Sequence, residues 1–249
     1  VIVGENDYVD DDKIDLTAMQ EDLSSYKGKT STSSPSPHEW ENAFGDADVV
    51  FCITITSTLS GTYNSAVIAK DIYEQNHAGR KVYVLDSLST GPEIALFIEK
   101  IAELIKAGFT PDDIYKTLLE YKDKTHLYFS LASLNNFAKN GRISPVIAAG
   151  IGLLGVRVVG KASDEGTLLP LDKCRGEKRA LKKLIDHLKE CGYTDGKIII
   201  AHNNNEAGAL ELKKLIENTF GIFNGKIQKT RALCSYYAEP GSLLIGFEA

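Results

Sequence analysis

The segment at residues 56–66 (TSTLSGTYNSA) constrains the fold most, because a strand pattern precedes it and a helix pattern follows it. Residues 49–55 are apolar, mostly β-branched and uninterrupted, as in a strand that is buried on both faces of a parallel sheet. From Tyr63 onward, apolar residues recur at helical spacing. The segment is therefore a strand-to-helix turn, which predicts an α/β fold class.

This turn is rich in hydroxyl groups at the point where the helix begins. Ser57, Thr58, Ser60 and Thr62 surround Gly61. A helix N-terminus has unpaired amides and a partial positive charge, so it attracts anions. Capping the helix needs a single hydroxyl, and this turn has four. In addition, a glycine lets the backbone approach a ligand closely, because it has no side chain. The turn predicts a carboxylate or phosphate site, and helix capping alone is the alternative.

Composition narrows the classes of function. The formal net charge is −6 and the sequence pI is about 5.5, which argues against nucleic acid as a partner. The four cysteines have no CxxC spacing, so we expect neither zinc nor a disulfide framework. No apolar run approaches 18 residues and no signal-peptide pattern is present, which predicts a cytoplasmic protein without an integral membrane segment. The acidic first 22 residues lack EF-hand spacing and are expected to form a solvated loop.

The first half of the chain alternates strands and helices. A second strand is predicted at 81–85, helices at 93–106 and 111–121, and a third strand at 126–131. Ligand sites in parallel sheets lie at the carboxyl ends of the strands. The turn after the first strand and the loop that begins with Asp86 and Ser87 are therefore expected to face one pocket.

After residue 131 the pattern changes to small residues and leucines, so we place a domain boundary there. Residues 1–131 are predicted to be a parallel α/β domain and residues 132–249 an α+β domain. The second domain is expected to contain a hairpin over 156–171, helices at 177–190 and 206–220, and strands at 197–201, 225–229 and 242–247, in a partly antiparallel sheet.

The remaining sequence patterns give little support for catalysis or for cofactor binding. Gly150, Gly152 and Gly155 match GxGxxG but follow a helical run, which argues against a dinucleotide site. The sequence contains no HExxH motif, so nothing in it indicates a metal-dependent enzyme. Ser60 lacks the GxSxG elbow, and only His202 follows a strand end where it could serve as a base. A serine-dependent hydrolase, or an acyl or phosphoryl transferase acting on a small anionic substrate, remains the alternative function.

Several motifs resemble the DegV family of bacterial fatty-acid-binding proteins. They are TSSPSP at 32–37, LSGTYNSA at 59–66, the strand-end DS at 86–87, the LxxxxKxGRIS pattern at 134–144, and RG followed by basic residues at 175–178. They occur in the family's order across most of the chain.

The resemblance implies two domains with a ligand tunnel between them. It implies a carrier that is not an enzyme, has no metal or cofactor, and presents the carboxylate of a long-chain fatty acid to a partner kinase for acyl-phosphate formation. The expected ligand-binding residues are Thr32, Ser33, Ser60, Gly61, Thr62, Ser87 and Tyr237. The expected docking residues for the kinase are Arg175, Lys178 and Arg179, within a basic series that could also be a solvated helix face.

Two departures from the family pattern affect these expectations. The family often carries an HxGPG-like segment near the ligand head group, where this chain has YAEPG at 237–241. Tyr237 is expected to replace the imidazole with a phenol, or Glu239 to disturb an anionic head group. Members of the family also begin with a strand and a DS motif, which this sequence lacks. The N-terminal domain is therefore expected to lack its first strand.

Overall fold

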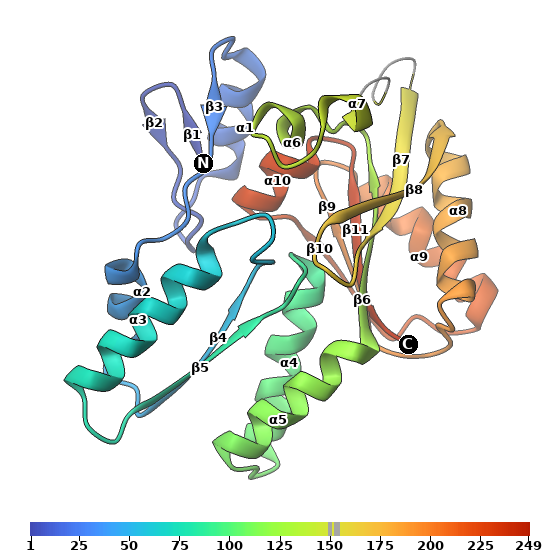
Figure 1. Ribbon diagram of the computed structural model, residues 1–249. Helices are drawn as coiled ribbons and strands as arrows, with labels where there is room; N and C mark the ends of the chain where they lie inside the picture. The colour runs from blue at the N-terminus through green and yellow to red at the C-terminus, as the bar shows by residue number, and fades with distance from the viewer. Residues whose placement is uncertain (149–150, 152–154) are drawn as a thin grey trace.

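The computed structural model describes residues 1–148, 151 and 155–249. Within these residues the chain forms a mixed α/β fold with a two-stranded parallel sheet, a six-stranded mixed sheet and a small antiparallel sheet near the N-terminus (Figure 1). Helices cover both faces of the parallel sheet, and helices also lie against both faces of the six-stranded sheet (Figure 1). None of the helices in these ranges is both long enough and apolar enough to cross a membrane.

The parallel sheet pairs β4 (Val49–Thr54) with β5 (Lys81–Asp86). One face packs against α2 (Pro37–Phe44) and α3 (Thr62–Asn76), and the other against α4 (Pro92–Lys106) and α5 (Pro111–Tyr121). Both faces of the strands are therefore covered, which explains their continuous apolar sequence. The strand and helix predictions for this part of the chain are confirmed.

The six-stranded sheet has the order β10-β9-β11-β6-β7-β8. Its strands, in chain order, are β6 (Thr125–Leu131), β7 (Val156–Ala162), β8 (Leu168–Arg175), β9 (Ile198–His202), β10 (Gly225–Lys229) and β11 (Leu243–Glu248). Only β9 and β10 are parallel, so the sheet is largely antiparallel. The helices α8 (Glu177–Glu190) and α9 (Glu206–Phe220) cover one face.

The strand β6 corrects one expectation. It was expected to extend the parallel sheet, but it pairs antiparallel with β11 and β7. Alternating apolar residues predict that a strand exists and which face is buried, but they do not identify its neighbours. The division of the chain after residue 131 stays a prediction.

The first 32 residues form a small unit that we call the N-terminal lobe. It contains β1 (Ile2–Val3), β2 (Asn6–Asp7), α1 (Leu16–Ser25) and β3 (Thr30–Ser31). The sequence predicted a solvated loop over most of this segment, which was wrong. Asp15 caps α1, because its carboxylate accepts hydrogen bonds from the amides of Thr17 and Ala18.

Four short helical segments complete the fold: η1 (Lys122–Lys124), α6 (Asn135–Lys139), α7 (Pro145–Ala148) and α10 (Ala232–Ala238). In Figure 1, α6 and α10 lie between the N-terminal lobe and the upper end of the six-stranded sheet. The GxGxxG pattern falls largely outside the described residues, since the structure describes neither Gly150 nor Gly152.

Candidate ligand-binding cavity

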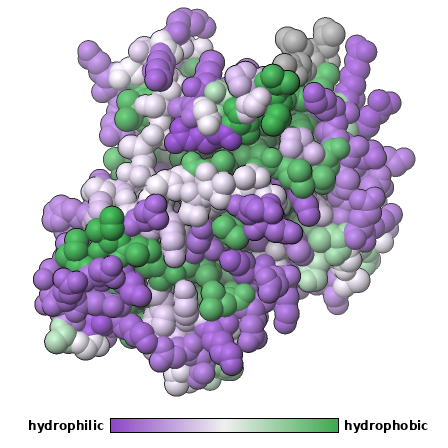
Figure 2. Space-filling view, in the orientation of Figure 1, coloured by the Kyte–Doolittle hydropathy of each residue, from purple (hydrophilic) through white to green (hydrophobic). Residues whose placement is uncertain are grey.

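A cavity of about 720 Å³ lies among the N-terminal lobe, the loops that follow β4 and β5, and the inner face of the six-stranded sheet. This volume lies within the usual range for small-molecule sites. Much of its wall is aliphatic or aromatic, with Ile53, Ile94, Leu127, Phe129, Leu131 and Leu244 among the residues that form it. In Figure 2, pale and apolar residues cross the middle of the molecule, while hydrophilic residues dominate its margins.

The strand β6 supplies the apolar floor of the cavity. Leu127, Phe129 and Leu131 point to the cavity side, whereas Tyr128 packs in the core beneath α8 and α9. This follows from the two-residue period of a strand, which sends alternate side chains to opposite faces. The strand that the sequence assigned to the wrong sheet is therefore central to the site.

Ser60 and Thr62 form a hydroxyl pair where α3 begins. Their side-chain oxygens lie 2.7 Å apart in a hydrogen bond, and the amide of Thr62 also donates to Ser60 Oγ at 3.3 Å. The N-cap residue, Gly61, provides no side-chain cap for the helix. Thr110, by contrast, caps α5 by accepting from the amide of Asp113. The first turn of α3 thus keeps donors available beside the cavity.

Gly61 leaves space at this position. Its φ of −73° is open to any residue, so its backbone conformation does not require glycine. A Cβ atom added there would meet Ser34 Oγ at 3.8 Å and would occupy part of the cavity wall. The predicted role of Gly61, close access of a ligand to the backbone, stays a prediction that this geometry permits.

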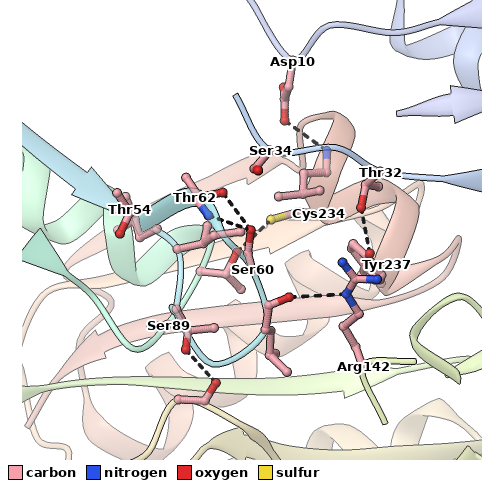
Figure 3. Close-up of a pocket in the computed structure, with 18 of the residues that line it drawn as sticks. Asp10, Thr32, Ser34, Thr54, Ser60, Thr62, Ser89, Arg142, Cys234 and Tyr237 are labelled. Atoms are coloured by element: carbon pink, nitrogen blue, oxygen red, sulfur yellow. Dashed lines mark hydrogen bonds between the residues drawn. The ribbon is translucent and has the colours of Figure 1, made fainter. Parts of the chain in front are cut away.

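Thr32 and Tyr237 face each other across the cavity wall (Figure 3). Their oxygens are 2.8 Å apart in a hydrogen bond in which either can donate. The ring of Tyr237 also packs on Phe137, with centroids 4.8 Å apart. The phenol therefore holds the threonine in place, and Ser33 lines the cavity next to it.

Arg142 is a cavity residue that the sequence interpretation did not single out. Its Nε donates to the carbonyl of Leu59 at 3.3 Å, so the guanidinium lies beside the backbone that precedes Ser60 (Figure 3). Among the described residues it has no carboxylate partner within 4 Å. The GRIS motif that contains it was the available signal. A guanidinium in this position can attract an anion.

The loops after β4 and β5 are joined by hydrogen bonds, and residues from both line the cavity, as expected. The carboxylate of Asp86 accepts from the amides of Ser57 and Leu88, each at 3.1 Å. Ser87 does not line the cavity, whereas Leu88, Ser89 and Thr90 do. Ser87 is 2% exposed, and its hydroxyl accepts from the amide of Ser89. Ser87 therefore stabilises the conformation of the loop that follows β5.

Two other hydroxyls of the loop between β4 and α3 contact the β7–β8 hairpin. Thr56 Oγ1 donates to the carbonyl of Gly166 at 2.9 Å, and Thr58 Oγ1 donates to the carbonyl of Glu165 at 2.6 Å. The hydroxyl cluster is therefore divided between two tasks. Ser60 and Thr62 line the cavity, Thr58 bonds the loop to the hairpin, and Thr56 does both.

In the part of the chain that the structure describes, no histidine forms a hydrogen bond to Ser60. His202 ends β9, is 4% exposed, and accepts from the amide of Asn205 through Nδ1. Burial lowers the pKa of His202. No histidine lines the cavity among the residues that the structure describes, and none of these residues form a cluster of three metal-binding side chains. The hydroxyl of Ser60 instead bonds to Thr62.

Glu239 and the predicted docking residues lie outside the cavity lining. The carboxylate of Glu239 accepts from Ser133 Oγ at 2.8 Å and from the amide of Asn136 at 3.1 Å, so it is engaged with the start of α6. Arg175, Lys178 and Arg179 are exposed at the end of β8 and on α8. The α8 margin of the molecule is hydrophilic in Figure 2.

Comparison with known proteins identifies the family. The family model described as "Uncharacterised protein, DegV family" matches residues 1–249. The chain belongs to the DegV family. A DegV domain-containing protein of Streptococcus pneumoniae is 42% identical over 246 residues, which are 99% of this chain and 88% of that protein.

Two solved structures match the fold closely. A DegV family protein from Eubacterium eligens, loaded with heptadecanoic acid, has a TM-score of 0.96 and 40% identity, and the match covers 99% of this chain and 89% of that one. The Streptococcus pneumoniae fatty acid kinase (Fak) B3 protein, loaded with linoleic acid, has a TM-score of 0.96 and 41% identity, with 99% and 88% covered. The resemblance that the motifs indicated is thus confirmed.

Proposed function

We propose that this DegV chain binds a long-chain fatty acid in the cavity. The observation that carries the proposal is that one cavity joins a cluster of donors to a long apolar wall. The carboxylate would lie near Thr32, Ser60 and Thr62, with Arg142 alongside, and Ser33 and Tyr237 would support that end. The acyl chain would lie along β6. The fatty acids in the two related structures support this assignment.

The chemistry of the two ends suits this ligand. Hydrogen bonds to a charged group contribute roughly 1.5–3 kcal/mol each, so a few donors are enough to orient a carboxylate. Burial of the chain contributes about 0.8 kcal/mol per CH₂ group. Affinity would come mainly from the apolar wall, and orientation from the hydroxyl end.

We also propose that the bound carboxylate is presented to a partner kinase, which would form the acyl phosphate. The name of the Streptococcus pneumoniae relative supports a link to a kinase system. The exposed Arg175, Lys178 and Arg179 would dock the partner. In this proposal the chain supplies no catalytic group, and Ser60 acts only as a hydrogen-bond donor.

The test is mass spectrometry of protein purified from a bacterial host, under native and denaturing conditions. We expect a released, non-covalent fatty acid in near-stoichiometric amount. Ser60→Ala and Thr32→Val should each weaken binding by about 10- to 100-fold, the loss that corresponds to a hydrogen bond to a charged group.

Ser57→Ala is the matched control, because Ser57 lies in the same loop but its side chain is exposed and does not line the cavity. This variant should retain the ligand. A wild-type protein that is empty and takes up no added fatty acid would overturn the proposal. A covalent adduct on Ser60 would instead favour the hydrolase or transferase alternative.

A further inference from the structure

The helix α10 forms part of the cavity wall but has no cap of its own. Leu233, Cys234 and Tyr237 of this helix line the cavity. Its N-cap residue, Arg231, makes no side-chain capping bond. A helix of seven residues with unpaired first amides is weak in isolation, so the groups that satisfy these amides decide where the helix lies.

Asp10 of the N-terminal lobe provides the missing cap from more than 220 residues away. One carboxylate oxygen accepts from the amide of Ala232 at 3.3 Å and the other from the amide of Leu233 at 3.0 Å. Figure 3 shows one of these bonds to Asp10. Arg231 Nε also donates to Asp10 at 3.2 Å. The carboxylate thus joins the lobe to the start of α10 by three charge-assisted hydrogen bonds.

Further hydrogen bonds connect the lobe to this side of the molecule, including the bond from Arg231 to Asp12 at 2.9 Å and the bond from Asn204 to Gln20 at 2.7 Å. Thr30 bonds to Tyr236 at 2.7 Å, Thr32 bonds to Tyr237 at 2.8 Å, and Gln20 donates to Asn203 at 2.9 Å. Among the described residues of the lobe, only Val3 and Met19 are buried hydrophobic side chains. The lobe therefore has a small apolar core and several hydrogen bonds to the rest of the molecule, each of which contributes little net free energy.

The lobe also covers the cavity. Tyr8, Val9 and Asp10 belong to its lining. A ligand has to pass one of the cavity walls, which also include the loops after β4 and β5 and the segment that carries Phe137 and Arg142. The lobe is a wall with only two buried apolar side chains of its own. Segments with few buried apolar contacts are the ones that open locally at the lowest free energy.

We propose that Asp10 is a clasp that holds the N-terminal lobe closed, and that release of the lobe admits and discharges the acyl chain. The inference rests on the proposed fatty-acid binding. Asp10 acts here as a positioning residue, because its carboxylate is engaged by Arg231 and by the amides of Ala232 and Leu233. If these contacts are made in both the empty and the loaded protein, losing them raises the association and dissociation rates of the fatty acid by the same factor. The equilibrium affinity then stays unchanged.

The test is stopped-flow kinetics with cis-parinaric acid, a fluorescent polyene fatty acid, and displacement by excess oleic acid. In Asp10→Ala we expect the association and dissociation rates each to rise about fivefold, the factor that corresponds to loss of a typical helix cap. The dissociation constant should stay within about twofold. Asp10→Asn, which keeps one acceptor, should give an intermediate change and is the deciding variant if Asp10→Ala does not fold.

Asp11→Ala is the matched control. It removes the same charge from the same loop, but the Asp11 side chain is exposed and accepts only from the nearby amide of Lys13. Its rates should equal those of the wild type. Unchanged rates in the Asp10 variants would overturn the clasp, as would faster dissociation alone with a weaker affinity. Failure of the wild-type protein to bind the probe would count against the proposed function instead.

Discussion

Glu93 places a carboxyl group inside the fold. It lies in the first turn of α4, is 4% exposed, and accepts a hydrogen bond from Thr125 Oγ1 at 2.8 Å. Burial raises the pKa of Glu93 above its ordinary value of 4.5, although the bond from Thr125 and the charge of Lys122 act in the opposite direction. The group therefore holds a proton in the folded state at pH values where the unfolded chain has released it.

This proton gives the free energy of unfolding a predictable pH dependence. The contribution of Glu93 is most favourable below pH 4.5 and is lost as the pH rises through the folded-state pKa, at a rate of about 1.4 kcal/mol per pH unit between the two pKa values. Urea denaturation of Glu93→Gln between pH 4 and 8 should show a flatter dependence than the wild type. Glu120→Gln, at an exposed position of α5, should leave the slope unchanged. Equal slopes for wild type and Glu93→Gln would contradict the prediction.

Residues of the cavity wall were predictable where a motif marked them, and their contact with a ligand stays a prediction. Six of the seven residues named from the sequence line the cavity, and Ser87 does not. Arg142 and Cys234 were missed. Arg142 reaches the cavity because its side chain extends to the carbonyl of Leu59, and Cys234 because Asp10 fixes the start of α10. Both placements depend on contacts across more than 80 residues, which local pattern does not encode.

Among the elements, those with a strong period were predicted and those fixed by tertiary contacts were not. The apolar stripe of α4 identified that helix within one residue of its start. The seven residues of α10 carry no local cap, and the strands of the N-terminal lobe have two residues each. Elements this short contain too little repetition for a period to be recognised.

The helix α8 carries a prediction of its own. Lys178→Glu combined with Arg179→Glu should leave fatty-acid binding unchanged, because both side chains are exposed outside the cavity lining. Phosphorylation of the bound acid by a bacterial fatty acid kinase should fall at least about tenfold at low salt, since reversed charge slows an electrostatically steered encounter. ATP-dependent formation of the acyl phosphate is the readout.

A matched double variant controls for the change in net charge. Lys106→Glu with Lys116→Glu alters α4 and α5 by the same number of charges at exposed positions. This variant should be phosphorylated like the wild type. Full activity of the α8 variant would remove α8 from the docking surface.

At the scale of the whole molecule, the sequence predicted two sheet-bearing parts with a ligand site between them, and the cavity is bounded by residues of both sheets. It did not predict which sheet would receive β6. That choice depends on pairing with β11, more than 110 residues later in the chain, and such long-range pairing leaves no local signal.

The position of the cavity predicts how affinity varies with the ligand. Each added CH₂ group of a saturated fatty acid should strengthen binding by about 0.8 kcal/mol, roughly fourfold, until the chain reaches the end of the apolar wall. Added salt should have little effect, because the apolar contribution is not screened. Displacement titrations with fatty acids of 12 to 18 carbons at two salt concentrations would measure both effects. An affinity independent of chain length would contradict an apolar binding site.

The contacts between the β4–α3 loop and the β7–β8 hairpin also determine which substitutions the tip of the hairpin tolerates. Glu165 and Gly166 contribute only their backbone carbonyls to Thr58 and Thr56. The side chain of Glu165 is exposed, so that position is free to vary. Gly166 has a φ of +76°, and an added Cβ would lie 2.1 Å from Thr56 Oγ1. A saturation library of the tip should therefore accept most residues at 165 and return only glycine at 166.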